Sequence, residues 1–349
     1  MKFYHISHTD LDGYACQLLT KEFFKTGFYI NANYGSEVKQ SIEAVLQEIK
    51  KNLDSEILFL ITDLNLTVGE SKDLNKEITA LNEAGANIKL QLLDHHATGQ
   101  KSANMYEWYL LDTTRCATKI VYDYLFDEYE GFNCQENAWI KPLVDAINAV
   151  DIWLDHEVEN FEFGKVLMRL VSRASEINNI LFADENRAFR ISLLKSAAAY
   201  IKEKDGHIKL DDEIHFLKKE YLKCNGSNDT IDNLSAKYLV HSLENRKEDL
   251  TITYRGHKGL LTYTLGSISI PANAFLKAND EYDFFIDISR RGNVSLRADG
   301  KIDVGILAEK LAKGGGHPNA SGAKFMDFVE TINYDDVKNF IQERLKRCE

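Results

Sequence analysis

The sequence has few prolines and no long apolar run. Only 3 of its 349 residues are proline, while 44% are hydrophobic. This composition is typical of a folded protein rich in helices. Crossing a bilayer takes roughly 20 consecutive apolar residues, and no stretch of the chain is that long. The start of the chain also lacks a signal-like segment. We therefore expect a cytoplasmic protein with no membrane partner.

Cysteine is also scarce, and the cysteines do not lie in pairs. They are scattered along the chain and form no Cys-x-x-Cys spacing, which argues against a disulfide framework and against a zinc knuckle. Reduced thiols are therefore expected at Cys16, Cys116, Cys134, Cys224 and Cys348.

The chain lacks the excess of basic residues that long nucleic acids require. It has 42 lysines and arginines against 54 aspartates and glutamates, a formal net charge of −12. Binding to long DNA or RNA depends mainly on basic contacts with phosphates. The charge therefore argues against long nucleic acid as a stable partner. A small anionic substrate stays possible, because a few local cations or metal ions can hold one or two phosphates.

A chain of 349 residues exceeds one ordinary hydrophobic core, so more than one domain is expected. Buried strands are predicted at 3–7, 57–61 and 88–93, and helices at 14–24, 41–50 and 74–84. This alternation is typical of a parallel, doubly wound α/β sheet.

The rest of the chain predicts a helical connector and a second, smaller α/β domain. The expected domain limits are 1–154, 155–236 for the connector, and 237–349. A break is expected at 225–229, strands at 238–241, 259–265, 282–289 and 293–298, and a helix at 304–313. No internal repeat is visible.

Acids and imidazoles follow the predicted strands of the first domain. These residues are His8, Asp10, Asp12, Asp63, Asp94, His95 and His96. Doubly wound sheets place their sites at the carboxyl ends of their strands, so we expect these side chains to meet at one edge. An aspartate such as Asp10 or Asp63 could instead cap a helix. A cap does not explain the histidines.

Asp151 follows a predicted helix at 138–150 and has apolar neighbours on both sides. Because burial of an unpaired carboxylate is costly, Asp151 needs a partner, and a metal ion would be a suitable one. Two divalent cations would balance the charges of four such carboxylates. Mixed oxygen and imidazole donors suit manganese particularly well, while iron, cobalt, zinc and magnesium stay open. Paired ions about 3.5–4 Å apart can clamp a phosphoryl group during hydrolysis.

Three consecutive glycines precede a histidine near the carboxyl end, at 314–317. These glycines could simply form a flexible helix end. The histidine that follows them favours another interpretation, in which the backbone amides closely approach a ligand. Arg297, on the preceding predicted strand, offers the planar fork that suits a phosphate, although many strand arginines face solvent.

Taken in order, these motifs resemble the DHH phosphoesterase superfamily, in which a DHH domain precedes a DHH-associated domain. The matching stretches are His-Thr-Asp-Leu-Asp-Gly at 8–13, Thr-Asp at 62–63, Asp-His-His at 94–96, Asp151, and Gly-Gly-Gly-His at 314–317. The resemblance covers nearly the whole chain. Within the superfamily, residues 61–64, 151–153 and 294–297 look most like nanoRNase B-type oligoribonucleases.

The resemblance implies two divalent metal ions, with manganese favoured, and a role for each residue. One ion would be held by His8 and Asp10, the other by Asp12, His95 and Asp151, with Asp63 bridging both. The catalytic residues would be His96 at the scissile phosphate, Asp94 as the orienter of a histidine, and Asp63. The rest of the substrate would be held by Arg297, Gly314, Gly315, Gly316 and His317.

The implied activity is a two-metal phosphodiesterase, an oligoribonuclease. It would hydrolyse short oligoribonucleotides and linear dinucleotides such as pGpG to 5′-mononucleotides by attack of a metal-bound hydroxide. The nearest alternative is a cyclic dinucleotide phosphodiesterase. The acidic charge disfavours a RecJ-like exonuclease, and the complete ligand set disfavours a non-catalytic nucleotide-binding protein. A homodimer stays open.

Overall fold

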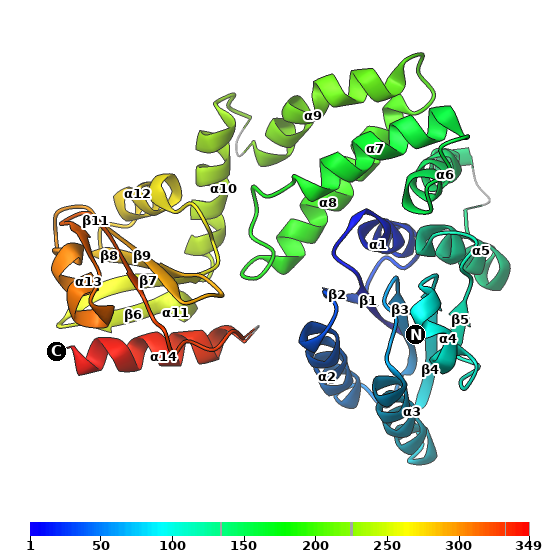
Figure 1. The fold of residues 1–349 in the computed structure, drawn as a ribbon, viewed down its shortest axis with the longest axis horizontal. Coiled ribbons are helices and arrows are strands. Elements are labelled where there is room, and N and C mark those ends of the chain that lie inside the picture. The colour runs from blue at the N-terminus through cyan, green and yellow to red at the C-terminus, as the bar shows by residue number, and fades with distance from the viewer. Residues whose placement is uncertain (133–134, 224–225, 332, 349) are drawn as a thin grey trace. The chain divides into compact units, whose positions relative to one another are not determined.

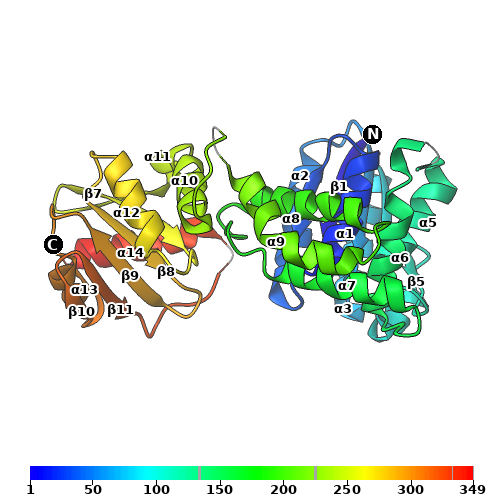
Figure 2. The same cartoon turned by 90° about the horizontal axis from the view of Figure 1, so that it is seen from above.

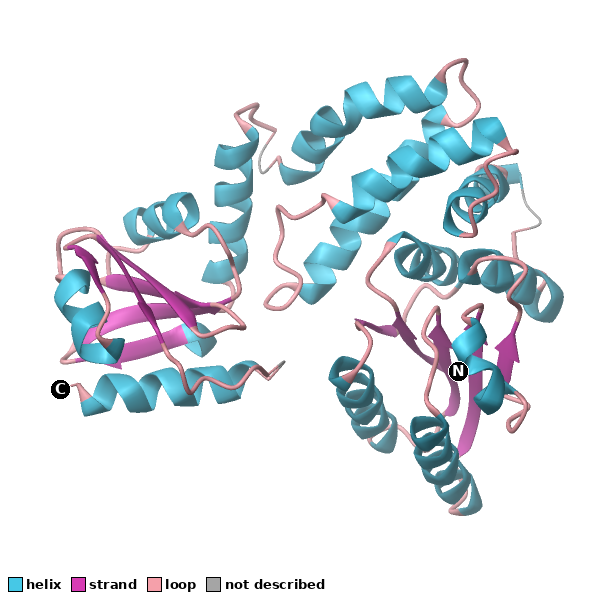
Figure 3. Ribbon diagram, viewed as in Figure 1, coloured by secondary structure: helices cyan, strands magenta, loops and turns pink. Residues whose placement is uncertain are grey.

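The computed structural model describes residues 1–132, 135–223, 226–331 and 333–348 (Figure 1). The chain divides into two compact units. The first unit comprises Met1–Ala174 and Arg187–Leu217, and the second comprises Ser175–Asn186 and Lys218–Glu349. Each unit is built around its own sheet (Figure 3).

The first unit contains a five-stranded sheet whose strand pairs are all parallel, in the order β2-β1-β3-β4-β5. The strands are β1 (Lys2–Ser7), β2 (Phe28–Asn31), β3 (Glu56–Thr62), β4 (Asn87–Asp94) and β5 (Tyr109–Leu111). Together with a second sheet of six strands in the other unit, this architecture confirms the predicted α/β class with a parallel N-terminal sheet.

Helices cover both faces of this sheet (Figure 3). On one face lie α2 (Ser36–Lys50) and α3 (Val68–Glu83), and on the other lie α1 (Leu11–Phe23), α5 (Ala117–Tyr129) and α6 (Ile140–Asp151). Successive strand residues point to opposite faces, so Phe59 packs in the first of these two cores and Leu58 and Leu60 in the second. Burial on both faces explains the continuous apolar run in β3.

The remaining helices of the first 222 residues are mostly long. They are α7 (Val158–Ser172), α8 (Ala183–Ala197) and α9 (Gly206–Leu222), with the short α4 (Gln100–Ala103). Single 3-10 turns occur at Ala97–Gly99, Gln135–Asn137 and Ala198–Tyr200. Within the described ranges, no helix has both the length and the apolar character needed to cross a membrane.

Gly164 permits the close packing of α7 on α6, the helix that ends at Asp151. A Cβ atom at this position would lie 2.4 Å from the Ala146 carbonyl oxygen and 2.7 Å from Cβ of Val150. Because neither atom belongs to a flexible side-chain end, Gly164→Ala must push the helices apart. We expect the free energy of unfolding to fall by about 1–3 kcal/mol, the usual cost of overpacking. Urea denaturation would measure it, and an unchanged value would contradict this packing.

The second unit contains a six-stranded mixed sheet, in the order β10-β11-β9-β8-β7-β6. Its strands are β6 (Thr251–Tyr254), β7 (His257–Tyr263), β8 (Phe284–Ile288), β9 (Asn293–Ala298), β10 (Gly315–His317) and β11 (Ala320–Lys324). Its helices are α10 (Ile231–Glu244), α11 (Lys247–Leu250), α12 (Ser269–Ala278), α13 (Val304–Ala312) and α14 (Tyr334–Arg347). Helix α12 contacts β8 and β9, whereas α14 lies on the opposite face and contacts β6 and β7 (Figures 1 and 2).

The strand predicted at 238–241 is wrong, because these residues lie inside helix α10. The helix begins after Thr230, whose side chain accepts a hydrogen bond from Asn233 N. Among the side chains of this helix, those of Leu234, Leu239 and Leu243 are buried. The short window 238–241 shows too little of this spacing to separate a helix from a strand. Of the other predictions, Cys134, Cys224 and residue 225 of the expected break lie outside the described residues.

Candidate metal centre and active site

The candidate site lies at the carboxyl edge of the parallel sheet. Strands β1, β3 and β4 are neighbours in the sheet and lead directly to the predicted acids and histidines. Asp10 and Asp12 lie at the start of α1, and Asp151 is the last residue of α6. The topology therefore brings together residues that are more than 140 positions apart in the sequence.

His8, Asp10 and Asp63 form one group able to hold a metal ion, with ligand atoms within 4.8 Å of one another. His8 Nδ1 lies 2.9 Å from Asp10 Oδ2 and 3.6 Å from Asp63 Oδ2. The group combines two carboxylates with one imidazole.

Asp12, His95 and Asp151 form a second group of this kind. His95 Nε2 lies 3.7 Å from Asp12 Oδ2 and 3.6 Å from Asp151 Oδ2. The same nitrogen is 3.4 Å from Asp63 Oδ1. Asp63 therefore presents one carboxylate oxygen to each group.

Asp63 reaches this position through an uncommon backbone conformation. Its φ angle is 57°, in the left-handed region that aspartate tolerates better than most residues. Its amide nitrogen donates to the Leu93 carbonyl oxygen at 3.1 Å, which ties the end of β3 to β4. Strained residues of this type concentrate at functional sites. Here the strained residue lies between the two candidate ligand groups.

Burial and mutual repulsion shift the pKa values of the cluster. Burial, followed by the charges of Asp12 and Asp10, raises the pKa of Asp63 well above its usual range. Burial, followed by the charge of Asp12, raises the pKa of Asp151 to about 8. Burial alone would lower the pKa of His8, but Asp10 and Asp63 outweigh it and raise this pKa to about 10. Without a cation, the cluster therefore retains protons at neutral pH.

Three polar atoms of the cluster are buried without a hydrogen-bond partner. They are Asp63 Oδ2, Asp151 Oδ2 and His8 Nδ1, whose 2.9 Å approach to Asp10 Oδ2 lacks hydrogen-bond geometry. Unsatisfied buried polar atoms are costly, so their presence in both ligand groups indicates a missing partner. Divalent cations would satisfy carboxylate oxygens and an imidazole nitrogen together. The residues present therefore fit bound metal ions.

Two nearby thiols are unsuited to ligation. Cys16 and Cys116 are fully buried, and burial, followed by the charge of Asp12, raises both of their pKa values well above the usual range. Because the thiolate is the metal-binding form, these cysteines remain poor ligands. The donor set thus consists of oxygen and imidazole nitrogen.

Asp10 and Asp12 also hold the local backbone. Asp10 caps α1 by accepting a hydrogen bond from Gly13 N at 3.0 Å. The two oxygens of Asp12 accept hydrogen bonds at 2.8 Å from the amides of Ala117 and Thr118, at the start of α5. The capping role considered for Asp10 is therefore present, and it coexists with membership of a ligand group.

Asp94 is completely buried and holds His96. Its Oδ1 lies 2.7 Å from His96 Nδ1, and its Oδ2 accepts a hydrogen bond from the Tyr109 hydroxyl at 2.8 Å. The carboxylate therefore fixes the orientation of the imidazole and leaves Nε2 for other partners. His96 also belongs to a third possible ligand group, with Asp63 and His95.

Tyr34 lies beside this cluster and was not predicted from the sequence. Its hydroxyl oxygen is 3.1 Å from His96 Nε2. Tyr34 follows β2, a strand that the sequence pattern did not reveal. Recognition of β2 would have identified Tyr34, because it too follows the carboxyl end of a parallel strand.

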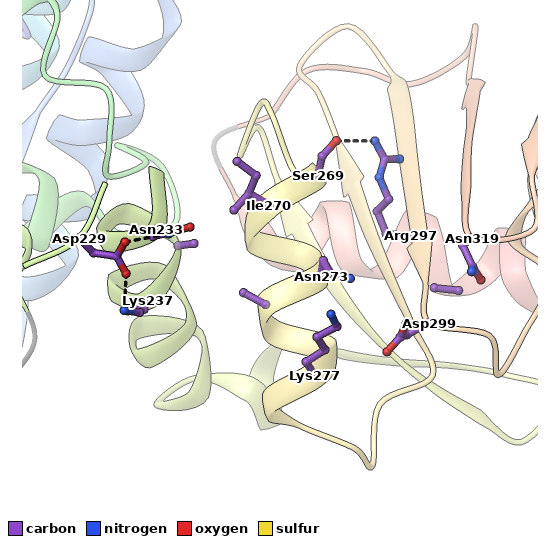
Figure 4. Close-up of a pocket in the computed structure, with 13 residues that line it drawn as sticks. Asp229, Asn233, Lys237, Ser269, Ile270, Asn273, Lys277, Arg297, Asp299 and Asn319 are labelled. Carbon is purple, nitrogen blue, oxygen red and sulfur yellow. Dashed lines mark hydrogen bonds and ion pairs between the residues drawn. The ribbon is translucent and has the colours of Figure 1, made fainter. Parts of the chain in front are cut away.

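In the second unit, Arg297 lines a pocket of about 710 Å³ (Figure 4). Its guanidinium group donates to Ser269 Oγ at 2.9 Å and to the Leu296 carbonyl oxygen at 2.8 Å. Lys277, Asn273 and Asn319 also line the pocket. The lining is thus rich in hydrogen-bond donors.

The glycine-rich segment at 314–317 follows α13 and includes β10, and it does not line this pocket. A Cβ atom on Gly314 would lie 2.2 Å from the Gly322 carbonyl oxygen, so this glycine is required by the packing of β11. Ala320 of β11 pairs with Arg297 of the neighbouring strand β9 and with His317 of the neighbouring strand β10. Arg297 and His317 therefore lie two strands apart.

Comparisons with known proteins agree with these features. Residues 260–347 match the DHHA1 domain family. A 3′,5′-cyclic-nucleotide phosphodiesterase of Helicobacter pylori (strain ATCC 700392 / 26695) is 43% identical over 343 residues, which cover 98% of each chain. Oligoribonuclease NrnB of Bacillus subtilis (strain 168) is 25% identical over 338 residues, which cover 93% of this chain and 74% of NrnB. The crystal structure of an uncharacterized protein from Helicobacter pylori G27 has a TM-score of 0.94 at 43% identity and covers 99% of both chains.

These comparisons confirm the predicted resemblance. The DHHA1 match falls on the second unit, and the Helicobacter pylori relative covers both units at an identity that shows common descent. The acids and histidines of the first unit that carried the resemblance meet at one sheet edge. The chain belongs to the DHH phosphoesterase superfamily, as a hydrolase of phosphodiester bonds.

Proposed function

We propose that this chain hydrolyses 3′,5′-phosphodiester bonds of small nucleotides and releases 5′-monophosphates, with two divalent metal ions held by the cluster at the sheet edge. The observation that carries the proposal is the shared carboxylate of Asp63, whose oxygens face His8 on one side and His95 on the other. A shared carboxylate of this kind suits a pair of ions that clamp one phosphate.

The relatives suggest two substrate classes. The relative that is 43% identical is named for 3′,5′-cyclic nucleotides, so this class is our first choice. Short linear oligoribonucleotides, including pGpG, are the second, because NrnB is an oligoribonuclease. The sequence alone favoured the linear class. In both classes one reaction suffices: water adds to phosphorus, the bond from phosphorus to the 3′ oxygen breaks, and that oxygen takes a proton.

Each residue of the cluster has a proposed task. His8 and Asp10 would hold one ion, and Asp12, His95 and Asp151 the other. When bound, such ions supply positive charge to the phosphate oxygens and lower the pKa of a water molecule. Asp94 would keep the His96 imidazole directed at the scissile phosphate, where it stabilises developing charge.

The second unit has a proposed supporting task. Arg297 and residues Gly314 to His317 would contact the part of the substrate away from the scissile bond. We keep the functional division into a DHH domain at 1–154, a connector at 155–236 and a DHH-associated domain at 237–349. The donor set favours manganese, and the scattered cysteines favour the reducing cytoplasm.

A comparison of initial rates tests the proposed substrate class. With added Mn²⁺, the enzyme would be assayed on a 3′,5′-cyclic nucleotide, pGpG, a five-nucleotide RNA, a cyclic dinucleotide, 3′-phosphoadenosine 5′-phosphate and long single-stranded DNA. We expect kcat/KM for the preferred small substrate to exceed that for long DNA by at least about 100-fold. The product should be a 5′-monophosphate. Fastest cleavage of long DNA, or release of 3′-monophosphates, would contradict the proposal.

A further inference from the structure

Tyr34 lies between His8 and His96, two histidines of the cluster, and contacts both rings. It lies in the short segment between β2 and α2, outside the motifs that define the superfamily resemblance. Its ring packs against the His8 ring, with centroids 4.9 Å apart, and against the His96 ring, with centroids 5.8 Å apart. Tyr34 is 43% exposed, so it borders the cluster on the side that solvent reaches.

The Tyr34 hydroxyl group lies within hydrogen-bonding distance of His96. It lies 3.1 Å from His96 Nε2 and 3.4 Å from His96 Nδ1. Because Nδ1 is 2.7 Å from Asp94 Oδ1 and is held there, Nε2 is the partner left for the hydroxyl. A phenol ordinarily carries its proton at neutral pH, so the hydroxyl has a hydrogen to donate.

The His96 imidazole is a hydrogen-bond partner of this hydroxyl that a substrate can replace. Without substrate, the hydroxyl lies within hydrogen-bonding distance of His96 Nε2, 3.1 Å away. A phosphate held at the neighbouring ligand groups would bring an anionic oxygen into the same region, and hydrogen bonds to anionic oxygens are roughly twice as strong as those between neutral groups. Exchange of His96 for the phosphate as the partner of the hydroxyl is therefore favourable.

We propose that Tyr34 is a further catalytic residue, whose hydroxyl donates a hydrogen bond to a nonbridging oxygen of the scissile phosphate beside His96. This inference rests on the proposed function. The donated bond strengthens as charge accumulates on that oxygen in the transition state, so it accelerates the chemical step more than it strengthens substrate binding.

Tyr34→Phe isolates the hydroxyl, because the variant keeps the ring that packs against His8. We expect kcat to fall about 10–100-fold with a smaller change in KM. The affinity for Mn²⁺, measured by titration calorimetry, should stay unchanged. Tyr29→Phe is the matched control: Tyr29 lies in β2, and its hydroxyl contacts the Phe24 carbonyl oxygen instead of the cluster. This control should keep wild-type kinetics.

Sulfur substitution distinguishes a contact with phosphate from a purely structural role. The Rp and Sp phosphorothioate diastereomers of the hydrolysed substrate, cyclic or linear, would be compared in wild type and Tyr34→Phe. Sulfur accepts hydrogen bonds poorly, so the variant's loss should shrink for one diastereomer and persist for the other. Equal losses for both diastereomers, or wild-type kcat in Tyr34→Phe, would overturn the inference while leaving the proposed function intact. Failure of the wild type to cleave any diester would overturn both.

Discussion

Asp63→Asn is expected to reduce kcat/KM by about 1,000-fold or more, which corresponds to ~4 kcal/mol of transition-state stabilisation. The reason is that Asp63 is shared: its two oxygens face His8 at 3.6 Å and His95 at 3.4 Å. An amide carries no charge to hold two cations. Asparagine tolerates the φ angle of 57°, so the change removes charge without adding backbone strain. Steady-state kinetics at several Mn²⁺ concentrations would measure the loss.

Asp145→Asn provides a control for loss of a negative charge in the same unit. Asp145 lies on α6, like Asp151, and pairs with Lys119 and Lys141 outside the cluster. We expect near-wild-type kinetics from this variant. If Asp63→Asn retained more than about a tenth of the wild-type rate at the same Mn²⁺ dependence, a difference of only ~1.4 kcal/mol, Asp63 would not be a shared ligand.

The affinity for metal ions is expected to rise steeply with pH. In the metal-free protein the pKa of Asp151 is raised to about 8 and that of His8 to about 10, so both groups carry protons between pH 6 and 7. Ligation requires both protons to leave. Each released proton changes an affinity about tenfold per pH unit. Because His8 and Asp151 belong to different ligand groups, the affinity for each ion should rise about tenfold from pH 6 to pH 7, and the product of the two binding constants about 100-fold. Calorimetric titration with Mn²⁺ in buffers of different ionisation enthalpy would count the protons, and a pH-independent affinity would contradict this account.

The same groups fix the sign of the pH dependence of stability. A carboxyl group whose pKa is raised on folding favours the folded state while protonated, and this contribution is lost as pH rises toward about 8 for Asp151. The contribution of His8 is complete below its unfolded value and is lost as pH rises through about 10. Metal-free protein should therefore have a lower Tm at pH 9 than at pH 6. Bound Mn²⁺ should raise Tm most at the higher pH, because the ligands are then already deprotonated.

The sequence predicted the position of the site better than its internal geometry. His8, Asp63 and His95 could be placed together because parallel strands end at a common edge, a rule that needs only strand assignments. The distances between them depend on the register of β1 with β3 and of β3 with β4, which is set by packing. Pattern alone therefore could not show that one carboxylate faces both groups.

The wrong strand assignment and the residues that were not predicted have local physical causes. Residues 238–241 look apolar over a short window, and only the longer spacing from Leu234 to Leu243 identifies α10 as a helix. Tyr34 could not be predicted because β2 has only four residues and one buried position. Tyr109 and Asp94 lie on two neighbouring strands. Their hydrogen bond therefore could not be predicted from a motif within one segment.

The most direct test of the account is the number of Mn²⁺ ions bound per chain when activity is saturated. Metal-free wild type and Asp63→Asn would be titrated with Mn²⁺ while the initial rate of diester hydrolysis is followed. We expect no hydrolysis without metal, two ions per wild-type chain at full rate, and fewer ions with little activity in Asp63→Asn. Full activity after complete chelation, or two tightly bound ions and normal rates in Asp63→Asn, would contradict it.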